Sequence, residues 1–248
     1  MKAPLWFSLW SFPAPYKGNE PAYVDEIDIA CTEAFTAQFD AIQKEVYAFL
    51  AERETIPYFK QSMVQHGKGY HTLSLAWWGI QFNKNQEVLP VLSSILKNHP
   101  ELLTLSINVL DANSSILPHM GDTNAIYRGH FGISIPTTLP QAGIRVKETE
   151  QSWKEGHFIW FMDAYTHETW NHTSQARIVL LVDVLRPEFR NQKKRICSTV
   201  MTSLFLQKRI EKYSFFKRNQ RWIVYYMAPI LIPLVRFRIT WINFTRKY

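Results

Sequence analysis

Two histidines and one arginine stand where they could form a single reaction site. His119 ends a short apolar segment, His167 begins another segment 48 positions later, and Arg177 follows His167 by ten positions. If these segments are strands of a barrel, their ends bring both imidazoles and the guanidinium to one mouth. A non-haem Fe(II) site that activates dioxygen usually has two histidines and a carboxylate on one face, with other positions open for cosubstrate and oxygen. An arginine that points inward needs an anion, and a carboxylate such as the tail of 2-oxoglutarate suits it.

Other catalytic chemistries lack their usual motifs in this chain. There is no H-E-x-x-H pair and no cysteine cluster, which disfavours a zinc hydrolase. There is also no G-x-S-x-G nucleophile elbow and no glycine loop to cradle a phosphate. Any one of the eight histidines, taken alone, is more often structural or exposed than a metal ligand. The pair at strand ends, with an arginine downstream, is what favours the iron site.

The second half of the chain supplies the strands that would position these residues. Short apolar or alternating segments recur every eight to twelve residues, with turn signals between them. This spacing predicts a β-sandwich or a jelly roll. The expected strands are 103–110, 114–119, 127–136, 143–147, 157–162, 167–171 and 177–185.

The first half is predicted to be mainly helical. Residues 1–23 are aromatic and contain prolines, so we expect an irregular segment packed across the body. Residues 25–54 carry apolar side chains near helical spacing and predict one or two helices, with Thr32 as a candidate cap. A strand-like piece at 72–78 and a helix at 90–99 follow. Helices before a jelly roll make an α+β order.

The charge of the chain is divided unevenly. The net charge is +7, but residues 191–248 hold 13 Lys/Arg and one acidic residue, and the remainder is mildly acidic. A basic tail on an acidic body indicates an anionic partner such as phospholipid head groups, nucleic acid or an acidic protein. Nucleic acid is disfavoured, because the tail has no recognisable reader motif and its aromatics lie in a proline-containing apolar patch.

That apolar patch spans residues 223–235 and contains Pro229 and Pro233. A membrane-spanning helix needs about 20 apolar residues, so we expect the proline-broken patch not to cross a bilayer by itself. Aromatics and cations around a short apolar segment suit a peripheral contact with an anionic membrane surface. Packing of the patch on the open side of the barrel is the alternative.

Two further features concern the compartment. Residues 1–16 lack an apolar stretch of the length that a signal peptide needs. Cys31 and Cys197 form no metal or redox motif, and we expect no disulfide between them because nothing indicates an oxidising compartment. We therefore expect a cytoplasmic protein, with a peripheral position on the inner face of the membrane as the alternative.

Several motifs of the strand region together resemble a known family. In chain order they are P-H-M-G-D-T-N, Y-R-G-H-F-G-I, W-K-E-G, H-E-T-W and the strand R-I-V-L-L-V-D. From about residue 105 to residue 187, the chain is similar to the aspartyl/asparaginyl β-hydroxylases, a family of Fe(II)/2-oxoglutarate dioxygenases. The resemblance implies a double-stranded β-helix (jelly-roll, cupin-like) core. With the helical predictions, this gives an α+β fold with N-terminal helices packed on the core and a helical, basic C-terminal tail.

The resemblance also implies roles for the three residues singled out first. His119 and His167 would bind iron, and Arg177 would pair with the far carboxylate of the cosubstrate 2-oxoglutarate. The implied reaction hydroxylates an unactivated C–H bond of an amino acid, a peptidyl Asp/Asn or a lipid-type substrate. Succinate and CO2 are released with the product.

Three supporting residues follow from the same resemblance. Arg128 and His130 match family positions near the cosubstrate and its inner carboxylate. Asn108 falls where the family has a small polar residue on the cosubstrate wall. The W-K-E-G run at 153–156 matches a turn before the second metal strand, which we interpret as structural. Each of the three supporting residues could also be a solvated or satisfied polar residue of the barrel.

Gly121 departs from the general pattern of 2-oxoglutarate enzymes. Most of them have H-x-D at the first metal strand, whereas His119 begins an H-x-G motif here. The resemblance implies that water takes the place of the missing carboxylate. The same loss opens a chloride site in halogenases, so the motif alone leaves both chemistries open, and the resemblance favours hydroxylation. Asp122 is adjacent, but on an extended segment its side chain would turn away from the metal.

We therefore predict a dioxygenase domain in residues 1–190 and a basic, aromatic, helical extension in residues 191–248. The expected partners are a small-molecule, peptidyl or lipid substrate and, through the extension, an anionic membrane surface. A non-catalytic jelly-roll interaction protein attached to such a surface is the alternative function.

Overall fold

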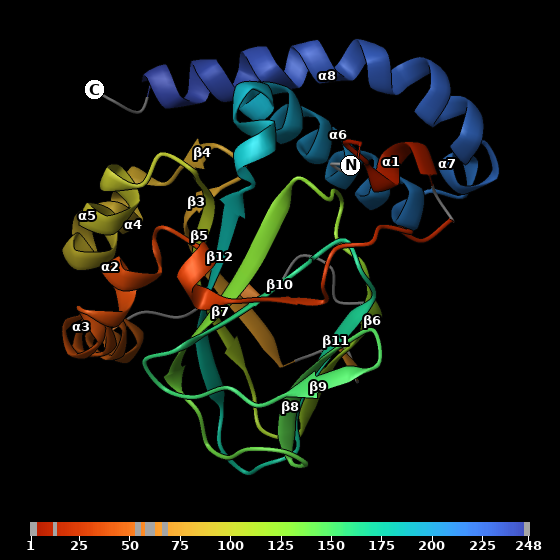
Figure 1. Cartoon of the computed structure of the whole chain (residues 1–248). Coiled ribbons are helices and arrows are strands. Elements are labelled where there is room, and N and C mark those ends of the chain that lie inside the picture. Colours follow the sequence, from red (N-terminus) through yellow and green to blue (C-terminus); the bar gives the residue numbers. More distant parts are fainter. Residues whose placement is uncertain (1–3, 12–13, 53–55, 58–62, 66–68, 246–248) are drawn as a thin grey trace.

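Two antiparallel sheets form the centre of the computed structural model, which describes residues 4–11, 14–52, 56–57, 63–65 and 69–245 (Figure 1). The larger sheet has eight strands, in the order β1-β10-β7-β12-β5-β3-β2 with β4 paired to β3. Its strands are β1 (Tyr23–Val24), β2 (Ile56–Pro57), β3 (Tyr70–Trp77), β4 (Ile80–Gln81), β5 (Leu102–Leu110), β7 (Ile126–Ser134), β10 (Phe158–Phe161) and β12 (Arg177–Leu185). The smaller sheet has the order β6-β11-β8-β9, with β6 (Ser114–His119), β8 (Ala142–Val146), β9 (Thr149–Gln151) and β11 (His167–Asn171).

Successive strands alternate between the two sheets. From β5 to β8 the chain moves from the larger sheet to the smaller sheet and back with each strand, and β10, β11 and β12 repeat this alternation. The sheets pack through a shared cluster in which Ile144 and Val146 of β8 meet Phe161 of β10 and Val179 of β12. This is a double-stranded β-helix, so the predicted jelly-roll core is confirmed. The seven predicted strands of the second half are present, and each end lies within two residues of its prediction.

Helices of the N-terminal half cover the outer face of the larger sheet. Phe35, Ile42 and Val46 pack against sheet residues such as Phe131 and Leu180, and all five are fully buried. The helical elements of this half are α1 (Ser8–Ser11), η1 (Glu26–Asp28), α2 (Thr32–Thr36), α3 (Phe39–Glu52), α4 (Asn83–Val88) and α5 (Pro90–Asn98). The predicted α+β order is therefore confirmed.

Two details of this half differ from expectation. Thr32 does not cap α2: Cys31 occupies the cap position, and the Thr32 hydroxyl accepts a hydrogen bond from Trp160 Nε1 at 3.1 Å. The Thr32 hydroxyl, which the local sequence assigns to the end of the helix, is thus used in a tertiary contact with Trp160 instead. Residues 8–11, which we expected to be irregular, form the single turn α1.

The C-terminal extension is helical, as predicted, and packs on one end of the core. It consists of η4 (Pro187–Gln192), α6 (Lys193–Lys212), α7 (Ser214–Arg218) and α8 (Gln220–Thr245). Ile196 and Val200 of α6 lie in a buried cluster with Leu103, Ile126 and Leu185 at the end of the larger sheet. Figure 1 shows α8 arching across the molecule on top of α6. The domain division at residue 190 stays a prediction.

The expectation that prolines break the apolar patch is wrong. The helix α8 continues through Pro229 and Pro233 for 26 residues. Each proline removes one backbone hydrogen bond and bends a helix, and two prolines four positions apart lie on the same face, so their bends add to an arch. By length and composition α8 could cross a membrane, and it is the only such helix in the described part of the chain.

Candidate metal and cosubstrate site

His119 and His167 face each other across two paired strands. They are directly opposite in the antiparallel register of β6 and β11. Their ring centroids are 4.2 Å apart, and the ring planes are inclined by 58°. Strand pairing therefore brings together two imidazoles that are 48 positions apart in the chain. His167 is buried, and His119 is half-buried.

The two rings are held by matching hydrogen bonds. Nδ1 of His119 lies 2.8 Å from the carbonyl oxygen of Leu117, and Nδ1 of His167 lies 2.8 Å from that of Tyr165. A carbonyl oxygen can only accept, so Nδ1 carries the proton in both rings and Nε2 presents its lone pair. Burial, together with the neighbouring His119, holds the pKa of His167 well below its ordinary value. Neutral imidazoles are the form in which histidine binds a divalent metal ion.

A carboxylate from another segment fills the space beside Gly121. Asp163 is fully buried, and its Oδ1 lies 3.6 Å from His167 Nε2 and 2.6 Å from Arg128 Nη1. A Cβ atom at Gly121 would lie only 1.7 Å from Asp163 Oδ2. The H-x-G motif is therefore matched to Asp163, because any larger residue at position 121 would displace this carboxylate. Burial raises the pKa of Asp163 to about 7, and Arg128 opposes the shift.

Sequence reasoning missed Asp163. The available signal was an acidic residue directly after the apolar run of β10, four positions before His167. In the described part of the chain, no cluster of three or more His, Cys, Asp and Glu side chains has the geometry of a metal site. Two histidines, with Asp163 beside them, are thus the donor set that the described residues provide.

Arg177 is a buried cation without a complete set of partners. Its side chain is 1% exposed, and its guanidinium stacks over the Trp153 ring at 4.5 Å. Among the described residues, no hydrogen-bond partner reaches its Nε or Nη1. Burial lowers the pKa of Arg177 to about 10. A buried charge with unmade hydrogen bonds is costly, so this position favours an anionic ligand, and a carboxylate of 2-oxoglutarate fits it.

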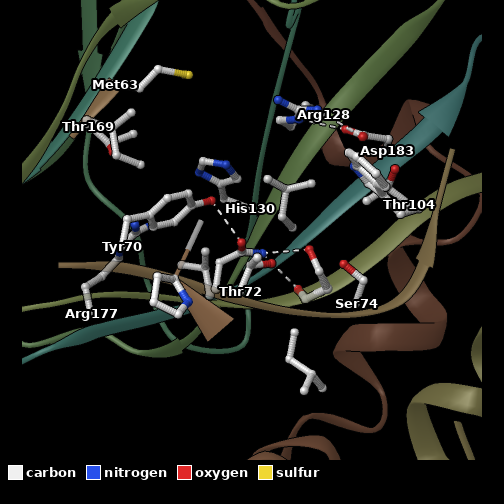
Figure 2. Close-up of a pocket in the computed structure, with 18 of the residues that line it drawn as sticks. Met63, Tyr70, Thr72, Ser74, Thr104, Arg128, His130, Thr169, Arg177 and Asp183 are labelled. Carbon is white, nitrogen blue, oxygen red and sulfur yellow. Dashed lines mark hydrogen bonds and ion pairs between the residues drawn. The ribbon is translucent and has the colours of Figure 1, made fainter. Parts of the chain in front are cut away.

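All six residues predicted from the sequence line one cavity of about 300 Å³ inside the core. The alternation of the strands explains why. Along β5, Leu105 and Ile107 face the helices, whereas Ser106 and Asn108 face the cavity. At these positions β5 is thus apolar on its outer face and polar on its inner face. The six residues are Asn108, His119, Arg128, His130, His167 and Arg177. Figure 2 shows three of them, Arg128, His130 and Arg177, in this cavity.

Arg128 and Asn108 already have protein partners in this cavity. Arg128 donates to both oxygens of Asp183, at 2.7 and 3.0 Å, while its third nitrogen contacts Asp163. Asn108 accepts a hydrogen bond from the Tyr70 hydroxyl at 2.9 Å and donates to Ser106. These contacts fix the shape of the wall. Their predicted contact with the cosubstrate stays a prediction.

The wall residue His130 packs against Trp153 and Phe161, which do not themselves line the cavity. The His130 and Trp153 rings are stacked at 6.1 Å, and the His130 ring meets Phe161 edge-on at 5.2 Å. Burial, and then the charge of Arg177, hold the pKa of His130 well below its ordinary value. We expected Trp153 only to stabilise a turn. It also carries the guanidinium of Arg177, a role that nothing in the local sequence indicates.

Comparison with known proteins gives consistent matches. A family model described as aspartyl/asparaginyl β-hydroxylase matches residues 36–187, more than half of the chain. An ornithine lipid ester-linked acyl 2-hydroxylase of Rhizobium tropici is 27% identical over 175 residues, which cover 68% of this chain and 62% of that protein. The Homo sapiens aspartyl/asparaginyl β-hydroxylase is 30% identical over 111 residues, which cover 43% of this chain and 14% of that protein.

The chain therefore spans less than two thirds of the length of these relatives. Among solved structures, a prolyl-4-hydroxylase of Pseudomonas putida is 12% identical, with a TM-score of 0.43. The superposition covers 62% of this chain and 89% of that one.

Proposed function

The chain belongs to the aspartyl/asparaginyl β-hydroxylase family, and from this premise we propose that it is an Fe(II)- and 2-oxoglutarate-dependent hydroxylase. The observation that carries the proposal is the pair of histidine rings, 4.2 Å apart, in the same cavity as a buried arginine whose Nε and Nη1 have no hydrogen-bond partner among the described residues. Together these groups offer a place for a divalent metal ion and a place for a dicarboxylate within one cavity.

His119 and His167 would hold the metal ion through Nε2, and Arg177 would bind the far carboxylate of 2-oxoglutarate. When bound, iron and 2-oxoglutarate supply the oxidation of a C–H bond by dioxygen, with succinate and CO2 as coproducts. Trp153 excludes water from one face of Arg177, which strengthens an ion pair formed there. The carbonyl groups of Leu117 and Tyr165 keep the imidazoles oriented for the metal.

Asp163 supports hydroxylation over halogenation. The space beside Gly121 is taken by its carboxylate, which would repel chloride at close range. The same carboxylate can accept a hydrogen bond from a water molecule that stands in for the missing H-x-D ligand. We therefore propose hydroxylation as the reaction and retain Asp163 as a positioning residue for that water.

We propose a lipid-type substrate. The Rhizobium tropici relative is named as a hydroxylase of an acyl chain of ornithine lipid, and the extension of this chain has the properties of a membrane-binding element. Only 11% of the most apolar 18-residue part of α8 is buried. Its outer face exposes large aromatic and aliphatic side chains: Trp222, Tyr225, Tyr226, Ile230, Leu234, Phe237, Trp241 and Phe244.

We further propose that α8 lies along a membrane surface rather than through the bilayer, on the cytoplasmic side. Both halves of the helix are tied to the same body. Near its start, Ile223 is buried in the cluster of α6. Near its end, Asn243 accepts from the backbone N–H of Gln81 at 3.1 Å and donates to the Gly79 carbonyl at 2.7 Å. A helix held to one body at both ends can lie along a membrane with its exposed apolar face in the interface.

Anaerobic titration of the full-length protein with Fe(II) and 2-oxoglutarate tests the function. We expect the weak visible charge-transfer band that such complexes give, followed by succinate release on addition of oxygen. His119→Ala should abolish the band and Arg177→Ala should weaken 2-oxoglutarate binding, whereas His157→Ala, at an exposed position, should change neither. An undiminished band in His119→Ala would overturn the assignment of the metal ligands, and absence of any band in the unaltered protein would overturn the proposed function.

A further inference from the structure

A second cavity, of about 270 Å³, lies beside His119 between α1, α6 and α8. We propose that this cavity binds the acyl chain of the lipid substrate. The proposal rests on the proposed function, because it places a C–H bond next to the metal ligand. His119 lines both cavities, so one imidazole separates the space for 2-oxoglutarate from the space that we assign to the acyl chain.

The lining of the second cavity suits a hydrocarbon chain. Its apolar side chains come from four segments: Leu9 of α1, Met120 after β6, Leu206 and Ile210 of α6, and Val224 of α8. Leu9 and Leu206 are buried. Transfer of hydrocarbon from water into such a space is favourable in proportion to the apolar area that is buried. The first cavity, by contrast, contains the buried cation Arg177 and the polar residues Ser106 and Asn108 of β5.

Three polar side chains of the second cavity share one carboxylate partner, and Glu211 and Gln220 also line the cavity. Ser8, Ser203 and Gln207 all donate to Oδ1 of Asp122, at 2.8, 2.6 and 2.9 Å. As expected from the sequence, Asp122 therefore points away from the metal site, and it ties α1 and α6 to the segment after His119. With this carboxylate satisfied by three donors, these four groups do not require a polar ligand.

A basic cavity adjoins the apolar one. The two share Leu9, Gln220 and Val224. The adjoining cavity, of about 820 Å³, combines three cations with three aromatic rings: Lys217, Arg218, Arg221, Trp10, Trp222 and Tyr225. An apolar space next to His119 that continues into a basic and aromatic space matches an amphiphile with an anionic head group and an acyl chain.

The position of Val224 links this path to the membrane. Val224 faces the apolar cavity, while Trp222, Tyr225 and Tyr226 of the same turns are exposed on the outer face of α8. In Figure 1 the helices α1, α6, α7 and the first turns of α8 gather at one corner of the molecule. A lipid at this corner can keep its head group at the surface while its chain passes behind α8 to His119.

Photo-crosslinking tests the assignment without relying on turnover. The full-length protein, loaded with Zn(II) and 2-oxoglutarate in phosphatidylglycerol nanodiscs, is illuminated with tetradecanoate that carries a diazirine at its terminal carbon. Labelled peptides are then identified by mass spectrometry. We expect label on the peptides that contain Met120, Leu206 or Ile210. Label on the exposed face of α8 serves as the internal reference for membrane partitioning.

Matched tryptophan variants decide the outcome. Val224→Trp fills the cavity and should reduce label there by about tenfold or more relative to the reference. Val88→Trp, at an exposed position on α4 away from α8, should leave it unchanged. Ile210→Trp fills the cavity from α6 and serves if Val224→Trp does not fold, as judged by thermal melting. Cavity label that is absent, or equal in filled and unaltered proteins, overturns the acyl-chain site alone, since the Fe(II) titration tests the hydroxylase independently.

Discussion

At the scale of single residues, Arg177 determines what the cavity can bind. Its guanidinium is buried on a tryptophan ring, and two of its nitrogens lack hydrogen-bond partners in the described part of the chain. Such a charge destabilises the fold until an anion binds. Arg177 is therefore positioned to bind an anionic ligand, and it lowers the stability of the ligand-free fold.

This leads to a prediction for Arg177→Met. Removal of an unpaired buried charge should raise the free energy of unfolding of the ligand-free protein by about 1–3 kcal/mol. The variant should also lose the increase in melting temperature that 2-oxoglutarate with Zn(II) gives the unaltered protein. Arg145→Met is the matched control, because Arg145 is exposed and pairs with Glu168. A destabilised Arg177→Met protein would show that the guanidinium has partners of its own.

Gly121 and Asp163 are sterically coupled, because the Asp163 carboxylate occupies the space that a side chain at position 121 would need. We predict that Gly121→Ala alone costs about 1–3 kcal/mol of stability, because the new methyl group overlaps the Asp163 carboxylate. In an Asp163→Ala background the same substitution should cost much less. Urea unfolding of the unaltered protein, the two single variants and the double variant measures this coupling. Additive effects would mean that the two positions do not compete for one space.

At the scale of elements, the start of α8 and the short helix α7 carry the cations that face a membrane in the proposed arrangement. We predict that replacing Lys217, Arg218 and Arg221 together by alanine weakens binding to phosphatidylglycerol vesicles by about a hundredfold at low salt, at about 1 kcal/mol for each cation. Raising the salt concentration should narrow the difference.

The control for this prediction carries the same change of net charge on the body of the protein. Lys44, Lys97 and Lys154 are exposed there, and their replacement by alanine should leave vesicle binding within a factor of about two. If both triple variants bind equally, net charge alone would account for the attraction, and the position of the cations beside α8 would not matter.

At the scale of the whole molecule, the proposed orientation places both ends of α8 on the same side of the membrane. Phe215 precedes the helix and Thr245 ends it, and both are exposed. In proteoliposomes, Phe215→Cys and Thr245→Cys should react equally with an impermeant maleimide before permeabilisation. A spanning helix would instead protect one of the two positions.

The native cysteines should not disturb this measurement. Burial raises the pKa of Cys31 to about 12 and that of Cys197 to about 11. Both thiols therefore stay protonated and unreactive at neutral pH. Labelling of the unaltered protein should be negligible, which the same experiment checks.

The sequence by itself determined the strands of the core and the two histidines. Alternation and turn signals are local properties, so β5 to β12 could be predicted to within two residues, with the three-residue β9 as the exception. The histidines, Arg177 and the three supporting residues followed from motifs in a fixed order. Strand periodicity also explains why all six side chains reach one cavity.

Only the tertiary structure decided what surrounds these residues. The contact of Asp163 with Gly121 joins segments that are 42 positions apart, and the stack of Arg177 on Trp153 joins a strand to a loop. The sequence did not predict that α8 continues through two prolines, because local propensity disfavours a helix there. Packing on α6 supports the helix instead. Local patterns specify which residues form each element. The packing between elements specifies which of their side chains meet, and the chemistry of this site depends on those meetings.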